Sequence, residues 1–472
     1  MSEEIIWASA TEIAKRIASR DISPVEVMAA TLKQAHLVQE NCNAFITIDE
    51  EQAMARAREA ENEKPRGSLH GVPISVKDLC NTRGLRTTFG SQAFKDNIPM
   101  ADCVAVARLK AAGAIVFAKT TTPEFGHKPL TEAPIFGRTL NPWDRTRTTG
   151  GSSGGSGAAV AAGAGSLAVG TDGGGSTRIP AAACGVVGMK QSLGVVPHDQ
   201  TPDVFGLLAY VGPMARTVAD AGLMLEAMAG PDSSDPHSLG RDLQGIQKAA
   251  SQPLDLRGVK IGWRTHLGNS LVDRETLSAF EASLKTLEDL GATLIERDDP
   301  FENTLSVWGP LTFSIWACRF AQIEEKIGEE MSDTLRYWMN EGRNYGAVDV
   351  QRAMETRTLL YRQIQSWFSE IDFLVTPTLA CPALPADQSP FDPVMINNNE
   401  AGGLRDGWYP YTHPFNLSGH PAITLPNGFT RDGLPTGGIQ FVGPWLSDTR
   451  LLELSAAYEG AAGISIRRPS FS

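Results

Sequence analysis

Residues 148–180, TTGGSSGGSGAAVAAGAGSLAVGTDGGGSTRIP, contain two Gly/Ser-rich clusters separated by an apolar run. The apolar run is interleaved with Ala, Val and Leu, which a solvated flexible linker would not carry. Glycine loses more conformational entropy on folding than other residues, so this density indicates unusual backbone angles or backbone N–H groups that approach a ligand closely. We expect a tightly packed helix over residues 154–163 and a strand over residues 166–171.

The same alternation of helix and strand recurs on both sides of this stretch. Thr217 and Asp220, in capping-box spacing, open one further helix. The further elements are expected over residues 102–112 (helix), 114–118 (strand), 217–230 (helix) and 259–263 (strand). This alternation predicts an α/β protein: a single large domain over residues 1–472, with a mixed, mostly parallel central sheet covered by helices on both faces.

The N-terminal region, residues 1–65, is expected to form an outer layer of helices. Ser9 is followed by Glu12, and residues 23–26 (SPVE) combine an N-cap, a proline at the first helical position and a capping-box carboxylate. A short buried strand is then expected over residues 72–76, and Lys77 follows directly at its end. Side chains emerge from a sheet at this position, so the placement favours a functional site within a catalytic core over residues 71–230.

Residues 300–411 differ from the rest of the chain, with longer helices and many aromatic residues. We interpret this segment as a variable helical region that contributes to a substrate pocket. Its rings fit either the wall of an apolar acyl or aryl pocket or ordinary core packing, and the sequence does not choose. Strand-like runs over residues 422–426 and 437–442 are expected to complete the sheet.

Composition excludes several classes of protein. The chain has 472 residues, 42% hydrophobic content and a formal net charge of −12, which argues against nucleic-acid binding because that function needs a basic face. No segment offers the roughly 20 apolar residues of a bilayer span. Glu3 and Glu4 occupy the place where a secretory signal carries lysines, so we expect a cytoplasmic protein without membrane contact.

The cysteines and histidines suggest no metal site and no cofactor. The six cysteines are scattered without a C-x-x-C pair, so we expect reduced thiols, with Cys103 and Cys184 buried among small apolar residues. The eight histidines contain no H-x-H or H-E-x-x-H arrangement, which disfavours a metal-dependent amidohydrolase.

Two chemistries require closely packed glycines: phosphate binding and oxyanion stabilisation. No Lys follows either glycine cluster as a P-loop requires, and no G-x-G-x-x-G follows a strand. The nucleophile elbow G-x-S-x-G matches residues 150–154 and 151–155, and an esterase of that type would need an acid and a histidine further along the chain. His237, His266, His413 and His420 are the candidates for that histidine.

A third possibility uses a neutral lysine as the base. Lys77 lies between an apolar strand and Leu79, where burial would lower its pKa. The alternative for this residue alone is a surface lysine in an ion pair.

Three motifs together resemble the amidase signature family, in the same order and along nearly the whole chain. They are residues 71–78 (GVPISVKD), residues 150–156 (GGSSGGS) and residues 170–180 (GTDGGGSTRIP). Pro377, Pro382 and residues 416–421 resemble later landmarks of the family.

The resemblance implies that Ser176 is the acylated nucleophile, Ser152 a bridging serine held by a cis peptide bond, and Lys77 the general base. Lys77 would take a proton from Ser152, and Ser152 would take one from Ser176 as Ser176 attacks the substrate carbonyl. Reversal of this relay would protonate the departing nitrogen. The expected activity is therefore hydrolysis of a small-molecule amide, carbamate or ureide through an acyl-enzyme, without a cofactor.

The resemblance also implies an oxyanion hole made of backbone N–H groups. These would come from Gly173, Gly174, Gly175 and Ser176. Asp172 and Arg178 flank the loop and are expected to brace it.

Some positions depart from the family pattern without removing a reactive atom. Gly173 stands where a larger residue is common, Thr177 where an aliphatic residue is common, and residues 189–192 read MKQS instead of LKPT. The extra glycine suggests a looser or wider oxyanion hole.

Two other functions within the family remain open. One is that of the glutaminase component of glutamyl-tRNA amidotransferase, which releases ammonia from glutamine for a partner. Residues 335–345 (LRYWMNEGRNY) show no counterpart of the RRIMLGT-like segment of those amidotransferase components. The other is a catalytically silent relative, which the presence of all three reactive residues disfavours.

The sequence leaves the substrate-binding residues unknown. Arg319, Arg336 and Arg343 are candidates for binding a substrate carboxylate, although lone helical arginines are more often solvated or ion-paired. A homodimer is expected from the family resemblance and the aromatic helices.

Overall fold

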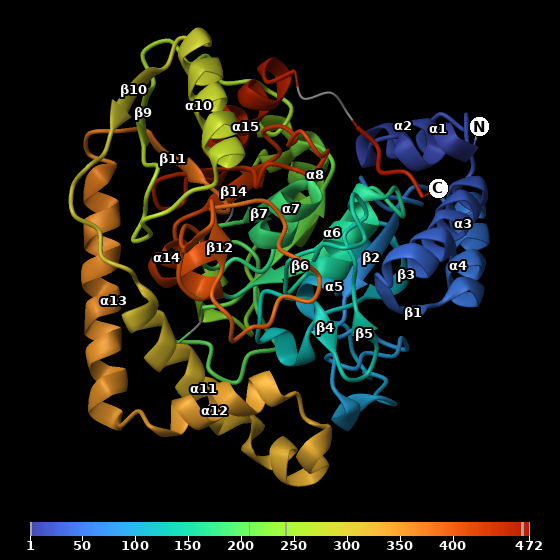
Figure 1. Cartoon of the computed structure of the whole chain (residues 1–472). Helices are drawn as coiled ribbons and strands as arrows, with labels where there is room; N and C mark the ends of the chain where they lie inside the picture. The colour runs from blue at the N-terminus through green and yellow to red at the C-terminus, as the bar shows by residue number, and fades with distance from the viewer. Residues whose placement is uncertain (1, 207, 241–242, 464–466, 472) are drawn as a thin grey trace.

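A long mixed sheet forms the centre of the computed structural model (Figure 1). The structure describes residues 2–206, 208–240, 243–463 and 467–471. Within these residues the sheet has eleven strands in the order β1-β3-β2-β6-β8-β7-β14-β15-β11-β9-β10. The strands are β1 (Phe45–Ile48), β2 (Pro73–Lys77), β3 (Ile115–Thr120), β6 (Leu167–Asp172), β7 (Val187–Lys190), β8 (Tyr210–Ala215), β9 (Lys260–Trp263), β10 (Thr293–Glu296), β11 (Phe373–Pro377), β14 (Ala422–Leu425) and β15 (Ile439–Val442).

Helices cover both faces of this sheet. Successive residues of a strand point to opposite faces, and β6 shows the two environments. Leu167 and Val169 belong to the large core cluster that also holds the side chains of α8, whereas Ala168 packs with Val160 of α6. The helices on the sheet are α5 (Val104–Ala111), α6 (Gly154–Ala161), α7 (Arg178–Cys184), α8 (Val218–Met228), α9 (Ile246–Ala249), α10 (Arg274–Asp289), α14 (His413–Ser418) and α15 (Asp448–Ala461).

Two groups of helices lie at the ends of the molecule in Figure 1. The N-terminal group lies near β1 and β3, and in the second group α13 packs against α14. The N-terminal helices are α1 (Ser2–Trp7), α2 (Ala10–Ala18), α3 (Pro24–Cys42) and α4 (Glu50–Asn62), and the second group is α11 (Leu305–Ile327), α12 (Asp333–Arg343) and α13 (Ala347–Trp367).

The predicted α/β fold with a mixed sheet between helical layers is confirmed. The expectation that the sheet is mostly parallel is wrong: among the described strands, six of the ten pairings are antiparallel. The difference arises in the centre, where β8 and β7 are antiparallel neighbours and β14 and β15 form another antiparallel pair. The sequence patterns did not indicate β8. They also did not indicate β11, which lies within the aromatic region of residues 300–411.

The local start signals of the helices formed as expected. The Ser23 side chain accepts from Glu26 N–H while the Glu26 carboxylate accepts from Ser23 N–H, which is a complete capping box at α3. The Thr217 hydroxyl accepts from Asp220 N–H at the start of α8. These contacts are local, so they follow directly from the sequence.

The cysteines are free thiols in the described structure, and Cys103 and Cys184 are buried as predicted. None of the described helices combines the length and the apolar character that a bilayer crossing requires.

Candidate active site

Lys77 is the last residue of β2, and its side chain is completely buried. Its Nζ lies 2.7 Å from the Ser152 hydroxyl and 2.8 Å from the Thr171 hydroxyl. Burial lowers the pKa of Lys77 to about 7, against a smaller opposing effect of Cys80 and Asp172. Lys77 is therefore not a surface lysine. Its amino group is neutral in a large fraction of the molecules at physiological pH.

Ser152 and Ser153 precede α6 and make different contacts. The peptide bond between Gly151 and Ser152 is cis. The Ser152 hydroxyl faces Lys77, whereas the Ser153 hydroxyl donates to the backbone carbonyl of Thr171 at 3.2 Å. The Ser153 N–H donates to the Ser176 carbonyl at 3.1 Å. The two glycine-rich segments are thus joined directly, and only Ser152 of this pair contacts the lysine.

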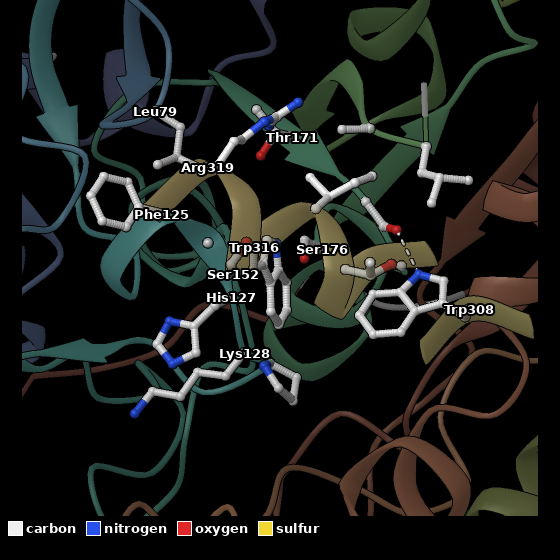
Figure 2. Close-up of a pocket in the computed structure, with 18 of the residues that line it drawn as sticks. Leu79, Phe125, His127, Lys128, Ser152, Thr171, Ser176, Trp308, Trp316 and Arg319 are labelled. Carbon is white, nitrogen blue, oxygen red and sulfur yellow. Dashed lines mark hydrogen bonds between the residues drawn. The ribbon is translucent and has the colours of Figure 1, made fainter. Parts of the chain in front are cut away.

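Ser176 lies in the loop between β6 and α7 and lines the same cavity as Ser152 (Figure 2). Its hydroxyl makes no hydrogen bond to any residue in the described ranges. The structure therefore brings Lys77 and Ser152 into hydrogen-bond contact and places Ser176 in the wall of the cavity that Ser152 also lines.

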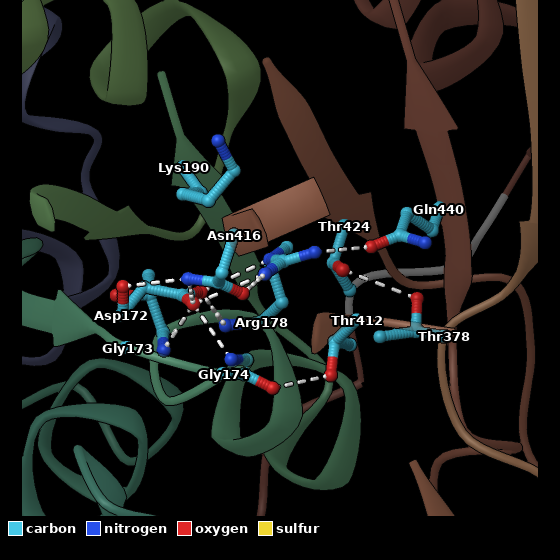
Figure 3. Close-up of polar contacts among 12 residues, drawn as sticks. Asp172, Gly173, Gly174, Arg178, Lys190, Thr378, Thr412, Asn416, Thr424 and Gln440 are labelled. Atoms are coloured by element: carbon cyan, nitrogen blue, oxygen red, sulfur yellow. Dashed lines mark hydrogen bonds and ion pairs between the residues drawn. The ribbon is translucent and has the colours of Figure 1, made fainter. Parts of the chain in front are cut away.

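The backbone of the loop before Ser176 is fixed by its carbonyl groups. The Gly173 carbonyl accepts from Trp308 Nε1 at 3.0 Å, and the Gly174 carbonyl accepts from the Thr412 hydroxyl at 2.7 Å. In a trans peptide the N–H points away from the carbonyl, so the N–H of Gly174 is directed away from Trp308. Figure 3 shows the contact between Gly174 and Thr412.

Gly175 has a different role from its neighbours. Its N–H donates to the Asp172 carboxylate at 2.6 Å, so this amide already has an acceptor within the protein. Its φ is +124°, and an added Cβ would lie 2.2 Å from the Thr412 hydroxyl oxygen, so only glycine fits there. Of the four amides that the resemblance implied, those of Gly173, Gly174 and Ser176 belong to residues that line the cavity.

Asp172 and Arg178 form a buried ion pair behind the loop (Figure 3). Arg178 Nε and Nη2 donate to the two carboxylate oxygens of Asp172 at 3.0 Å each. The remaining donors of Arg178 reach Asn416 and Gln440, each at 2.7 Å. Burial raises the pKa of Asp172, but Arg178 and Asn416 outweigh it and hold that pKa at about 2. The sequence did not reveal that Asn416 and Gln440 complete this network.

Aromatic side chains form much of the cavity wall (Figure 2). Trp308, Trp316 and Phe320 come from α11, and Phe125 and Tyr409 come from elsewhere in the chain. Other rings of the aromatic region, including Trp367, Trp408 and Tyr411, are buried in the core and do not line the cavity. One subset of the aromatic residues therefore lines the cavity and another belongs to the core, and a role of the first subset in substrate binding stays a prediction.

The three candidate arginines fall in different places. Arg319 lines the cavity and donates to the Thr201 hydroxyl at 2.8 Å. Arg336 donates to the Gly328 carbonyl, and Arg343 pairs with Glu324, both outside the cavity lining. A fourth arginine, Arg405, also lines the cavity, and sequence reasoning did not single it out.

The nucleophile-elbow interpretation needs a histidine at the serines. His127 lines the cavity, but its ring nitrogens contact the Glu124 carbonyl and the Thr334 hydroxyl instead. In the described residues the hydroxyls of Ser152 and Ser153 contact Lys77 and Thr171 and no imidazole. Burial lowers the pKa of His413 to about 3, and the His420 nitrogens contact Ser418 and Gln365. Neither histidine lines the cavity with Ser176.

Comparisons with known proteins show which family the chain belongs to. The family model described as Amidase matches residues 26–452. An acylamidase of Rhodococcus erythropolis is 38% identical over 479 residues, covering 100% of this chain and 98% of the relative. A glutamyl-tRNA(Gln) amidotransferase component of Thermosynechococcus vestitus is 34% identical, covering 95% and 96% of the two chains.

Among solved structures, a bacterial aryl acylamidase of the amidase signature family superimposes with a TM-score of 0.89 at 29% identity, covering 96% of both chains. The chain belongs to the amidase signature family and is an amidase-type hydrolase.

Proposed function

We propose that this protein hydrolyses the C–N bond of small-molecule amides through an acyl-enzyme, with Ser176 as nucleophile, Ser152 as bridging serine and Lys77 as general base. One observation carries the proposal. A buried lysine whose pKa is lowered to about 7 lies 2.7 Å from a serine hydroxyl in the cavity that Ser176 also lines.

Each step of the reaction has a residue that can perform it. Neutral Lys77 accepts the Ser152 proton, and Ser152 accepts the Ser176 proton while Ser176 Oγ bonds to the carbonyl carbon. The N–H groups of Gly173, Gly174 and Ser176 stabilise the resulting oxyanion. The C–N bond breaks as the proton returns through Ser152 to the nitrogen, and water then hydrolyses the ester by the same relay.

The cavity supports an amide with an apolar or aromatic group. Trp308, Trp316 and Phe320 offer a rigid apolar wall next to Ser176. The acylamidase and aryl acylamidase names of two similar proteins agree with such a substrate.

Labelling with a fluorophosphonate, followed by intact mass and peptide mapping, tests the nucleophile. We expect one adduct on Ser176 that the variant Ser176→Ala abolishes and Lys77→Ala slows. Ser153→Ala is the matched control, because Ser153 neighbours the bridging serine without contacting Lys77, and it should still be labelled. An adduct on Ser153, or none, would contradict the assignment and return the elbow or silent-relative interpretation.

The amidotransferase alternative needs its own measurement, because similar proteins include amidotransferase components. Purified protein should hydrolyse simple anilides without any partner and release no ammonia from glutamine. Glutamine hydrolysis that depends on a copurifying partner protein would favour the alternative. The homodimer stays a prediction, which size-exclusion chromatography with light scattering would test.

A further inference from the structure

Arg405 is a buried cation without a counter-ion. It belongs to the short π-helical turn Leu404–Trp408, and only 8% of its surface is exposed. In the described structure its guanidinium makes no hydrogen bond or ion pair, and its Nε is buried without an acceptor. Such burial of an unpaired charge is unfavourable, because the charge loses its hydration and gains no anion in exchange.

Three aromatic rings surround the guanidinium and hold it in place. The centroids of Trp308, Phe313 and Trp338 lie 4.9, 5.2 and 4.6 Å from its central carbon. The ring faces attract a cation and replace part of its lost hydration. They offer no acceptor in the plane of the guanidinium, so its N–H donors remain available for a planar anion.

Arg405 lies close to the reacting groups. It lines the cavity that contains Ser152 and Ser176. The indole of Trp308 touches both Arg405 and the loop that precedes Ser176. Its N–H donates to the Gly173 carbonyl in this loop, and its face packs against Arg405. A group bound by Arg405 would therefore be held one indole ring away from the Gly173 carbonyl.

The neighbouring charges do not neutralise this arginine. Asp406, on the same turn, accepts from Asn303 at 2.6 Å. Lys128 is paired with Glu132, and Asp203, which also lines the cavity, lies near Arg319. The protein as a whole carries a net charge of −12, so any attraction for an anionic substrate must come from a local cation such as this one.

We propose that Arg405 binds a carboxylate on the substrate, so that the preferred amides of this enzyme carry an acidic group on the part that lies against Trp308. The inference rests on the proposed amide hydrolysis and names its substrate class. Carboxylate and guanidinium match in a planar, two-hydrogen-bond geometry. Arg405 is a specificity-determining residue in this account and takes no part in the proton relay.

Two pairs of synthetic anilides test the inference, each pair differing in one charge. 4-Acetamidobenzoate and 4-acetamidotoluene place or remove the carboxylate on the amine side. Succinanilate and butyranilide do so on the acyl side. We expect kcat/KM in at least one pair to favour the acid by about tenfold or more, since a charge-assisted bidentate contact is among the stronger polar interactions.

Variants then assign the preference to Arg405. Arg405→Met should reduce the acid-to-neutral ratio to about one or below through a higher KM for the acid, and Arg405→Lys should keep part of it. Arg319→Met is the matched control, because it removes the same charge from the same cavity and should leave the ratio above one. An unchanged ratio in Arg405→Met, or an equal loss in Arg319→Met, would overturn the inference.

A binding measurement keeps the inference testable if Arg405→Met does not fold. Benzoate should inhibit wild-type turnover of 4-acetamidotoluene competitively, and benzamide should inhibit at least tenfold more weakly. Wild-type enzyme that hydrolyses neutral anilides without any preference for acids or for benzoate would refute the role of Arg405 alone. Failure to hydrolyse any amide would instead refute the proposed function.

Discussion

The loop of the proposed nucleophile, residues 173–177 (the nucleophile loop), and the aromatic wall of the cavity each lie beside a buried arginine. The two arginines differ in their hydrogen-bond partners. Arg178 is completely buried, and its donors reach Asp172, Asn416 and Gln440. Arg405 is nearly as buried, but among the described residues its guanidinium has ring faces around it and no hydrogen-bond acceptor. A fully partnered charge fixes a backbone, whereas a buried charge with unused donors is suited to a ligand.

Lys77 shows a third way to bury a cation. Its neighbours are the hydroxyls of Ser152 and Thr171, and burial lowers its pKa until the charge is easily lost. The cost of burying a positive charge is therefore met in three ways in this protein. Arg178 is paired with an anion, Lys77 loses its proton easily, and Arg405 keeps N–H donors that no protein group uses.

Replacing each of the two arginines in turn should give the largest difference between the two regions, in the free energy of unfolding. Arg178→Met leaves the Asp172 carboxylate buried without a partner, so we expect a loss of about 3–5 kcal/mol in the free energy of unfolding. Arg405→Met removes an unpaired charge and should change that free energy by less than about 1 kcal/mol, or raise it. Denaturant unfolding of both variants measures the difference, and equal losses would show that Arg405 is also structural.

Within the nucleophile loop, two glycines should respond differently to an added methyl group. Gly175→Ala forces a Cβ against Thr412 at a φ of +124°, and we expect about a 10²-fold loss of kcat as the oxyanion donors move. The Cβ added by Gly173→Ala lies 3.9 Å from the Ala209 methyl, which is an ordinary contact. The kcat of this variant should therefore stay within about threefold of the wild-type value. Equal effects would show that the loop does not depend on this backbone geometry.

The third buried cation should be visible in the pH profile. Protonated Lys77 cannot accept a proton, so kcat/KM should fall about tenfold per pH unit below its pKa of about 7 and level off above it. Asp172, with a pKa of about 2, stays ionised over this range. The matched control is Glu459→Gln, because burial raises the pKa of Glu459 to about 7 while its carboxylate accepts from Val218 N–H on α8. If the fall in kcat/KM below pH 7 disappears in this control, that fall does not report the titration of Lys77.

Trp308 joins the two regions, and its replacement should have the smallest effect. Trp308→Phe removes the hydrogen bond to the Gly173 carbonyl while keeping a ring near Arg405, so we expect a loss of about 1 kcal/mol, or roughly fivefold in kcat. The acid-to-neutral substrate ratio should change little. A large change in that ratio with a constant kcat would mean that the indole acts on the anion and not on the loop.

Local patterns account for what the sequence predicted well. The caps at Ser23 and Thr217 depend on residues three positions apart, and Lys77, Ser152 and Ser176 lie within short motifs. The contact between Thr412 and the Gly174 carbonyl joins residues 238 positions apart, so no local sequence pattern predicts it. Arg405 lies in no motif, and its surroundings come from α11 and α12. The antiparallel centre was missed because β8 was not recognised, and pairing is decided by partners distant in sequence.

The strand order has a consequence for how the chain is made. β14 and β15 are synthesised after the other strands of the sheet, yet they lie between β7 and β11. Until they emerge, β7 presents an unpaired edge and Arg178 lacks its acceptors Asn416 and Gln440. We expect the nascent protein to need protection from aggregation, and catalytic competence to arise in one late step on the ribosome or after release.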